Sequence, residues 1–400
     1  MIKNNTAIML IRNGIKSNNT SPLFVLLAIC FTVIVVTAAG CNRIRQKDNT
    51  DGSLLLIRDS QIDRLLHIDS LIEPGSLKFT LLENRRDSAF IGDLDFRFAS
   101  DDALIFFNKR LNILVIFSYD GKLKKELDLN QLIGFDFKIA DIRNNPYSSR
   151  IEILDMKNTL YTFSANGDFL GTEEQFKTYP HSLFYPLSDS TYVLYNNFTT
   201  NAGKTDPCRF YVLKHFNKTR SWWPLDTSLV IVLPVNNRQF YQSSGELRFF
   251  DPLFPVIYTV SDTGLTPKYR LKYQQFNLTT KNALDVRSII KETKFHPVPA
   301  MNYFIESDKY CIMEYILAQH RYSSVCDKAT GKSLGVSYFG LGLSNLGVTL
   351  YNPLFAKDSK NFLTVLYGEE IIRNKEKHSG FKALEGLKNY DKVLVSFRFK

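Results

Sequence analysis

A hairpin pattern that recurs at a nearly constant interval is the feature that most constrains this fold. Each copy has an aromatic or β-branched strand, a small polar turn and a second strand, as in FFDPLFPVIYTVSDTGLTPKYRLKY over residues 249–273. Glycine supplies the positive φ that a tight turn needs, and neighbouring Asp or Thr side chains can bond the turn backbone. The turns of the five copies are marked by Gly121, Gly167, Asn217, Gly264 and Gly331.

The interval between these turns identifies the architecture. Successive turns are 46, 50, 47 and 67 residues apart. A unit of about 40–50 residues with four short strands is typical of β-propeller blades. The longest interval contains residues 279–293, whose apolar spacing and lack of Gly and Pro predict an inserted helix. An all-β sandwich is the alternative, but its turns recur roughly every 8–12 residues without a longer period.

The expected fold is therefore an all-β, six-bladed β-propeller with short helical insertions. Its core would use the high Phe and Tyr content, 31 and 20 residues, in sheets packed face to face. A propeller avoids an open edge when one terminus supplies a strand to the blade of the other. Residues 77–82 and 393–399 are the expected pair, and residues 369–387 predict a second helical insertion. The six blades are expected at residues 89–129, 135–176, 181–226, 229–274, 299–339 and 347–399.

Several of these segments carry a resemblance to a known family. They are SLKFTLLENRRDSAFIGDLDF (76–96), DDALIFFNKRLNILVIFSYDGKLKKEL (101–127), the FFDPLFPVIYTVSDTG hairpin and the closing strand DKVLVSFRFK (391–400). Through them the chain resembles the TolB-like six-bladed β-propeller lipoproteins of two-membrane bacteria, from about Leu77 onward. The resemblance implies the fold and a place in the cell envelope. It implies little about activity.

The first 41 residues predict a lipoprotein leader. A basic start is followed by the uncharged apolar run PLFVLLAICFTVIVV (22–36) and by Thr-Ala-Ala-Gly-Cys (37–41). This order describes a secretory signal, and the small residues before Cys41 resemble the bacterial lipobox. We expect residues 1–40 to be removed and Cys41 to be acylated, with palmitate among the chains. The alternative is a transmembrane anchor, although the run is shorter than the ~20 residues that span a bilayer. Met1 or Met9 could be the true start.

The segment after Cys41 predicts a tether. Residues 42–53 are polar without periodicity, so residues 41–53 are expected to link the lipid to a propeller that occupies residues 54–400. Two or three acyl chains give stable anchoring. We therefore expect the protein at the outer membrane, on its periplasmic face or at the cell surface, and as a monomer.

The positive charge of the chain does not indicate nucleic-acid binding. The formal net charge is +10, of which Lys3, Arg12 and Lys16 lie in the leader. The other Lys and Arg residues are scattered, whereas nucleic-acid binding needs a clustered basic patch. The densest run, residues 373–382, contains a Glu and a His and is typical of a solvated helix face. The net positive charge also implies, more weakly, an attraction of the protein to acidic polymers or anionic surfaces.

The cysteines predict no metal or redox centre. Apart from Cys30 and Cys41 the chain contains Cys208, Cys311 and Cys326, and no CxxC motif. If Ala318-Gln319 is a two-residue turn, Cys311 and Cys326 lie opposite each other on neighbouring strands. An oxidising compartment would allow a disulfide between them. Two buried thiols are the equally acceptable interpretation.

The sequence contains no catalytic motif that stands out. Neither HExxH nor GxSxG is present, and the Gly-rich segment GLGLSNLG (340–347) lacks the Lys-Ser/Thr of a phosphate loop. We expect no cofactor and no metal. Propellers bind ligands where the innermost strands of the blades begin. The side chains expected to line that channel, and to bind a polar ligand, are Arg97, Lys138, His181, Tyr185, Arg238, Asn302 and Asn352.

Two functions remain open at this stage. The first is a non-catalytic binding or interaction module on a membrane, with an unknown protein or carbohydrate partner such as a glycan. The second is an enzyme on the same scaffold, a glycosidase or polysaccharide lyase with acids in the central channel. The second needs two carboxylates at the separations that such chemistry uses. The first is favoured because no catalytic signature is present.

Overall fold

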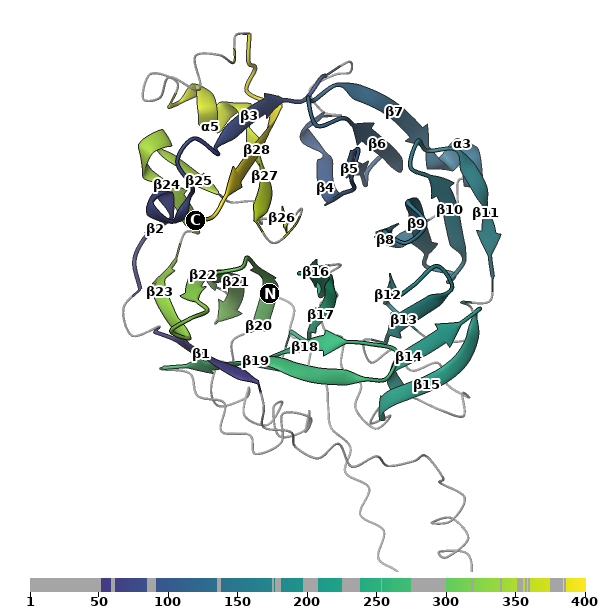
Figure 1. The fold of residues 1–400 in the computed structure, drawn as a ribbon. Helices are drawn as coiled ribbons and strands as arrows, with labels where there is room; N and C mark the ends of the chain where they lie inside the picture. Colours follow the sequence, from purple (N-terminus) through teal and green to yellow (C-terminus); the bar gives the residue numbers. More distant parts are fainter. Residues whose placement is uncertain are drawn as a thin grey trace, which may run out of the picture. The chain divides into compact units, whose positions relative to one another are not determined.

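Antiparallel strands dominate the computed structural model, and strands that follow each other along the chain pair with each other. The description covers residues 52–58, 62–84, 91–134, 138–174, 176, 181–196, 208–224, 238–252, 254–274, 300–317, 320–338, 340–350, 355–356, 358, 360–374, 384 and 386–400. Within the unit Asp51–Lys400 the sheets are arranged around a common axis, as Figure 1 shows. The fold is all-β and propeller-like.

Three sheets are four-stranded meanders that follow the chain in order, and the first strand of each is nearest the axis (Figure 1). The first sheet contains β4 (Leu94–Ala99), β5 (Leu104–Asn108), β6 (Ile113–Phe117) and β7 (Leu123–Asp128). The second contains β8 (Ile139–Asn145), β9 (Arg150–Asp155), β10 (Leu160–Ser164) and β11 (Phe169–Glu173). The third contains β12 (Leu183–Pro186), β13 (Thr191–Tyr195), β14 (Cys208–Lys214) and β15 (Asn217–Pro224).

The next two meanders are joined in one nine-stranded sheet. One meander contains β16 (Phe240–Ser243), β17 (Glu246–Phe250), β18 (Val256–Val260) and β19 (Leu265–Tyr273). The other contains β20 (Ala300–Glu306), β21 (Tyr310–Leu317), β22 (His320–Asp327) and β23 (Lys332–Ser337). Each meander lies within the residue range of one expected blade, but the outermost strands of the two meanders are not free edges.

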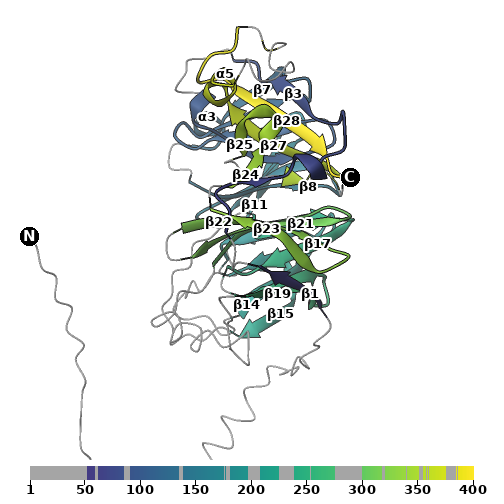
Figure 2. The same ribbon diagram turned by 90° about the vertical axis from the view of Figure 1, so that its left-hand side faces the viewer.

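The strand that joins them is β1 (Ser53–Ile57), which sequence analysis did not predict to lie here. It pairs in parallel with β19 over its full length and with β23 at Leu56↔Lys332. Figure 2 shows β1 beside β19 and β23 at the periphery of the ring. The tether predicted over residues 41–53 was therefore one residue too long, because Ser53 already belongs to β1.

The sheet that closes the ring draws on both ends of the described chain. It contains β26 (Phe355–Ala356), β27 (Asn361–Tyr367), β28 (Lys392–Arg398) and, outermost, β3 (Lys78–Leu81). β3 pairs antiparallel with β28, from Ser396↔Lys78 to Val393↔Leu81. This is the strand pair that the sequence predicts.

A small sheet and short helices complete the described elements. The sheet has β2 (Leu66–His67), β24 (Leu341–Leu343) and β25 (Val348–Leu350). The expected sixth blade at 347–399 was therefore too long, because residues 348–350 pair with β24 instead of β27. The helical elements are η1 (Asp69–Leu71), α3 (Leu129–Ile133), η3 (Ser344–Leu346) and α5 (Gly368–Ile372). α5 falls in the second predicted insertion.

The core lies between the sheets, in hydrophobic clusters that follow one another around the ring. In β6, Ile113, Val115 and Phe117 pack toward the sheet of β26–β28, whereas Leu114 and Ile116 pack toward the sheet of β8–β11. Because side chains alternate between the two faces of a strand, a strand with both faces covered is buried at every position, as β5 and β6 are. Further clusters join each remaining pair of neighbouring meanders.

Four of the five predicted turns are confirmed and one was misplaced. Gly121, Gly167, Gly264 and Gly331 lie between the paired strands that the sequence predicts. Asn217, however, begins β15 and pairs with Lys214, so the turn is His215-Phe216, with φ of 46° and 61°. Two positive φ values are typical of the type I′ hairpin turn. The Phe216 ring stacks on Tyr192, with centroids 5.8 Å apart.

The predicted register of the two central cysteines is confirmed. Cys311 lies directly opposite Cys326 on β21 and β22. Both are free, buried thiols in this structure, as is Cys208. Burial raises the pKa of the Cys326 thiol to about 12 and that of Cys311 well above its usual range.

Some predictions fall outside the described residues. These are the leader at 1–40, the acylation of Cys41, the helix at 279–293 and the channel position of Asn352. Among the residues that are described, no helix is both long and apolar enough to cross a bilayer.

Candidate functional site

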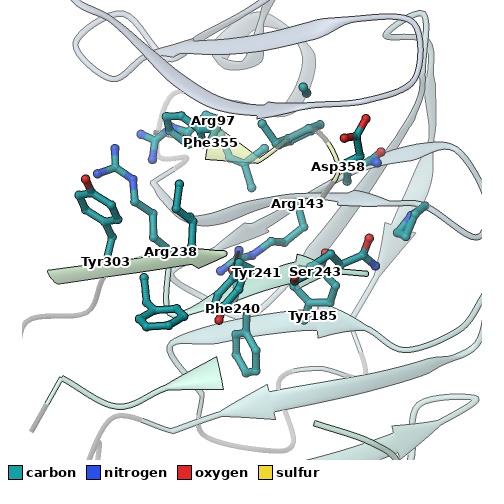
Figure 3. Close-up of a pocket in the computed structure, with 18 of the residues that line it drawn as sticks. Arg97, Arg143, Tyr185, Arg238, Phe240, Tyr241, Ser243, Tyr303, Phe355 and Asp358 are labelled. Carbon is teal, nitrogen blue, oxygen red and sulfur yellow. Dashed lines mark hydrogen bonds between the residues drawn. The ribbon is translucent and has the colours of Figure 1, made fainter. Parts of the chain in front are cut away.

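The innermost strands of all the meanders line one cavity. It has a volume of about 420 Å³, and residues of β4, β8, β12, β16, β20 and β26 contribute to its wall. A volume of this size is in the range of small-molecule sites, about 300–1,000 Å³. We call it the central cavity. Figure 3 shows three arginines, Arg97, Arg143 and Arg238, among its lining side chains.

β-Bulges interrupt several of the strands that form this wall. The register shifts between Phe96 and Phe98 in β4, between Ile139 and Asp141 in β8, and between Met301 and Tyr303 in β20. A bulge adds an unpaired residue and re-aims the side chains around it, and bulges are common next to functional sites. Arg97 is the extra, unpaired residue of β4. Its side chain therefore does not follow the regular alternation of side chains between the two faces of the strand.

Arg97 is held by an acid two residues before it. Its Nη2 lies 3.3 Å from Asp95 Oδ2, and its guanidinium carbon lies 5.3 Å from the centre of the Phe107 ring. Its Nε is buried and has no hydrogen-bond partner among the described residues. The side chain is thus oriented but retains an unused donor.

Arg143 repeats this arrangement on the next sheet. Its Nε donates to Asp141 Oδ2 at 2.8 Å and its Nη1 donates to the Phe240 carbonyl at 3.4 Å. Its guanidinium carbon lies 5.5 Å from the centre of the Tyr185 ring. Asp141 also accepts from the Ile142 amide. Burial raises the pKa of Asp141, and the neighbouring Arg143 cation opposes that rise.

Arg238 lies just before β16, on the same side of the view as Arg97 and Tyr303 (Figure 3). Its guanidinium carbon lies 5.2 Å from the centre of the Phe355 ring. Burial lowers the pKa of Arg238. The Asp95 carboxylate raises this pKa in part, and the like charge of Arg97 lowers it further. One end of the cavity therefore brings Arg97 and Arg238 toward Asp95, and the Glu314 carboxylate also acts on Arg238.

Aromatic rings and one rim carboxylate complete the wall. Tyr185, Phe240, Tyr303 and Phe355 contribute ring surface. Among the described lining residues the one acid is Asp358, which is exposed. Its Oδ1 accepts from the amides of Lys360 and Asn361, each at 2.8 Å, and its Oδ2 accepts from Asn361 Nδ2. Each of its oxygens therefore accepts at least one hydrogen bond within its own turn.

Three of the predicted channel residues line the cavity and three described ones do not. Arg97, Tyr185 and Arg238 are in the wall. Lys138 is exposed before β8, and its carbonyl accepts from the Met156 amide. His181 is buried against the Phe176 ring between two sheets. Asn302 is the bulged residue of β20 and donates to Glu314 Oε1.

Sequence analysis missed Arg143, although a signal for it exists. The spacing Asp-x-Arg occurs at Asp95–Arg97 and again at Asp141–Arg143. In each pair the carboxylate lies beside the guanidinium of the arginine two residues later, so the spacing marks both arginines of the cavity wall. The expected start of the second blade, Asp136–Lys138, lay before the strand and hid this repetition.

Among the described residues, no group of three or more His, Cys, Asp or Glu side chains could hold a metal ion.

A family comparison identifies the chain more closely. The profile described as a domain of unknown function, DUF4934, matches residues 82–395. The chain belongs to the DUF4934 family. No curated protein matches it. The matched residues of this DUF4934 chain include every strand that lines the central cavity.

One solved structure shows a similar fold, and two others match less closely. An exported protein of Bacteroides fragilis has a TM-score of 0.62 and 12% sequence identity, with 87% of this chain and 100% of that chain covered. A DUF4221 family member from Bacteroides vulgatus has a TM-score of 0.46 and 15% identity, with 82% and 98% covered. BamB from Moraxella catarrhalis has a TM-score of 0.34 and 12% identity, with 71% and 72% covered. The first of these likenesses supports the fold alone.

Proposed function

We propose that this protein is a lipid-anchored, six-bladed β-propeller that binds a small polar ligand in its central cavity and does not transform it. The observation that carries the proposal is the wall of the cavity, to which the innermost strand of every meander contributes. The proposed count of six blades takes the nine-stranded sheet as two blades. The small sheet of β2, β24 and β25 is not counted as a blade. The relation to TolB-like lipoproteins is part of the same proposal.

Binding without catalysis is favoured by the chemistry of the wall. Hydrolysis or elimination of a glycan would need two convergent carboxylates or an equivalent acid–base pair. Among the described lining residues the single carboxylate, Asp358, already accepts three hydrogen bonds. Cations and aromatic rings provide orientation and contact area instead. A carbohydrate suits this combination because its ring stacks on aromatic surface and its hydroxyls accept from guanidinium groups.

The proposed location is the cell envelope. Residues 1–40 act as the signal, Cys41 carries the lipid, and residues 41–52 link it to the propeller at the outer membrane. The leader sequence supports this. Labelling of growing cells with an alkynyl fatty acid tests it. The wild-type chain should be labelled and the Cys41→Ser variant should not be, and equal labelling of the two would refute the anchor.

Binding is tested on a glycan array with the purified full chain in detergent. Asn144→Trp places a large ring in the cavity wall, and Lys124→Trp places the same ring on the exposed side of β7. We expect the first variant to lose the glycan signal and the second to keep it. Absence of any wild-type signal, or a signal that survives Asn144→Trp, would overturn the proposal. Mass spectrometry of the recovered glycan adds a second criterion, since any cleavage product would refute a purely binding role.

A further inference from the structure

The joined sheet turns one side of β19, β1 and β23 away from the rest of the ring. Because side chains alternate along a strand, Leu55 and Ile57 of β1 point into the cluster between the two meanders. Leu54 and Leu56 therefore point away from it. Leu54 is 55% exposed, and Leu334 on β23 is 50% exposed. We call this outward side of the three strands the outer face, and Figure 2 shows the strands at the periphery of the ring.

Basic side chains share the outer face with these leucines. Arg270 of β19 lies opposite Leu54 in the parallel register. Lys272 of β19 and Lys332 of β23 both lie opposite Leu56. Both lysines are exposed. Since residues that pair directly point to the same side of a sheet, apolar and cationic groups alternate across the three strands.

Few acids oppose the cations of the outer face. The strands β1, β19 and β23 themselves contain no Asp or Glu. Among the residues paired with them, the acids are Asp327 on β22 and Asp63, which bridges to Ser337. Asp327 Oδ1 accepts from the Thr330 amide at 2.8 Å within its own turn. A positively charged, partly apolar surface of this kind suits anionic lipid headgroups.

The chain also enters the ring at this face. β1 begins at Ser53, twelve residues after Cys41. An extended chain spans at most about 3.3–3.6 Å per residue, so a lipid on Cys41 keeps Ser53 within about 40 Å of the bilayer. All other strands of the ring are linked to the anchor through β1. An anchor at Cys41 therefore restricts β1 to the neighbourhood of the membrane more tightly than any of them.

We infer that the outer face docks on the anionic lipid surface of the membrane that carries the anchor. This inference rests on the proposed lipid anchor and adds the orientation of the ring. Leu54 and Leu334 enter the headgroup region, and Lys272 and Lys332 contact lipid phosphates, with Arg270 beside them. Because the outer face lies at the periphery (Figure 1), the axis of the ring runs along the membrane. The bilayer then covers neither end of the ring.

Two other assignments fit the same observations less well. A two-fold dimer brings the same patch of both subunits together, so a second copy on the outer face would place like charges opposite each other, which is unfavourable. On β11, Phe169 and Leu170 are also exposed, at 48% and 53%. Two acids, Glu173 and Glu174, follow this pair, and an anionic surface would repel them.

Lipid quenching in reconstituted vesicles tests the inference. Leu334→Cys and Leu170→Cys each introduce one exposed thiol, on the outer face and on β11, whereas the native cysteines of the described chain are buried. The acylated protein, labelled there with a fluorophore, is placed in vesicles of phosphatidylethanolamine and phosphatidylglycerol that contain a spin-labelled lipid headgroup. We expect strong quenching at position 334 and little at position 170. Replacing both lipids by phosphatidylcholine, or adding salt, should reduce the quenching at 334.

Charge reversal separates docking from anchoring. Each cation near an anionic bilayer raises the docked population roughly fivefold. Lys272→Glu/Lys332→Glu should therefore lower the ratio of quenched to unquenched label at position 334 by about 25-fold or more. Lys122→Glu/Lys124→Glu makes the same change in net charge at and before β7, across the ring from β1 (Figure 1), and should leave the ratio unchanged. If the first variant does not fold, Lys272→Gln/Lys332→Gln replaces it.

Flotation of the vesicles in high salt, recorded on the same samples, reports the anchor separately. Protein that floats, with quenching confined to position 334 and lost in the Lys272/Lys332 variant, supports the inference. Floating protein with equal quenching at both positions, or with equal quenching at 334 on phosphatidylcholine, overturns it and leaves the anchor intact. Protection of the 334 label from an aqueous quencher in detergent, if it disappears on dilution, identifies a second copy as the occupant and also overturns it. Protein that does not float refutes the anchor and the inference together.

Discussion

At the scale of single residues, the hairpin glycines have a second role besides the turn. Gly121 has a φ of 84°, which the turn between β6 and β7 requires. A Cβ at this position would lie 2.2 Å from the Leu81 carbonyl oxygen at the end of β3. The turn of the first sheet therefore touches the strand that closes the ring, and glycine is needed for the contact as well as for the backbone angle.

This distinction predicts unequal costs for two similar substitutions. Gly75 has nearly the same backbone angle, a φ of 74°, but no atom lies within 4 Å of its would-be Cβ. Gly75→Ala should cost about 1 kcal/mol of unfolding free energy through backbone strain alone. Gly121→Ala should cost at least about twice that, because β3 must move away. Urea denaturation of both variants measures the difference, and equal losses would show that the contact with β3 contributes nothing.

Lys392 provides a pH-dependent prediction at the same scale. Its side chain is 4% exposed, donates to the Leu94 carbonyl and has its Nζ 4.8 Å from the centre of the Tyr367 ring. Burial lowers the pKa of Lys392 to about 8, against the opposing influence of Asp95 and Asp93. Between that value and the ordinary 10.5 the unfolded chain binds more protons than the folded chain, so this group makes stability rise with pH.

The variant Lys392→Met isolates the effect from other titrating groups. The unfolding free energy of the wild type minus that of the variant should increase by about 2 kcal/mol between pH 7 and pH 10. Urea denaturation across this pH range gives the difference directly. A difference that stays constant with pH would mean that the Lys392 amine titrates as it does in water.

At the scale of elements, β1 shows how a short strand can link two sheets. Its side chains alternate between exposed and buried, since Leu54 is 55% exposed while Leu55 is 1% exposed within the cluster that joins the sheets of β16–β19 and β20–β23. Its backbone covers the outer edges of both β19 and β23. Covered edges cannot pair with another chain, so β1 protects two meanders at once.

Neighbouring leucines on β1 should therefore respond very differently to truncation. Leu55→Ala should lower the unfolding free energy by about 2–5 kcal/mol, which is the usual cost of truncating a fully buried leucine. Leu54→Ala should change it by less than about 0.5 kcal/mol, as expected for an exposed position. Thermal and urea unfolding of the two variants provide the test. Similar effects at both positions would contradict the observed register of β1.

At the scale of the whole molecule, the repeat made the fold predictable, whereas the site was predictable only in part. Turn spacing and strand composition are local properties, so they located the meanders. The pairing of β3 with β28 was predicted from the need to close the ring without an open edge. The place of β1 escaped prediction because no such rule links it to partners more than 200 residues away in the sequence. Arg143 escaped because the predicted start of the second blade, residues 136–138, lay before β8, whose bulge between Ile139 and Asp141 leaves no clear mark in the sequence.

The closure of the ring gives the last prediction. Lys78 on β3 lies directly opposite Ser396 on β28, in register, whereas Arg398 lies two positions further along. The double variant Lys78→Cys/Ser396→Cys should form a disulfide under mild oxidation, because directly opposite residues on paired strands lie within the reach of a disulfide. Lys78→Cys/Arg398→Cys should form it poorly.

The same cross-link measures how much the closure stabilises the ring. It would enclose more than 300 residues of chain between positions 78 and 396, and restricting so long a loop in the unfolded state is worth at most about 5 kcal/mol. We therefore expect a rise in Tm that a reducing agent abolishes in the first variant and that is absent from the second. Equal cross-linking of both pairs would indicate that β3 slides along β28, and failure of both would place the closing strand elsewhere.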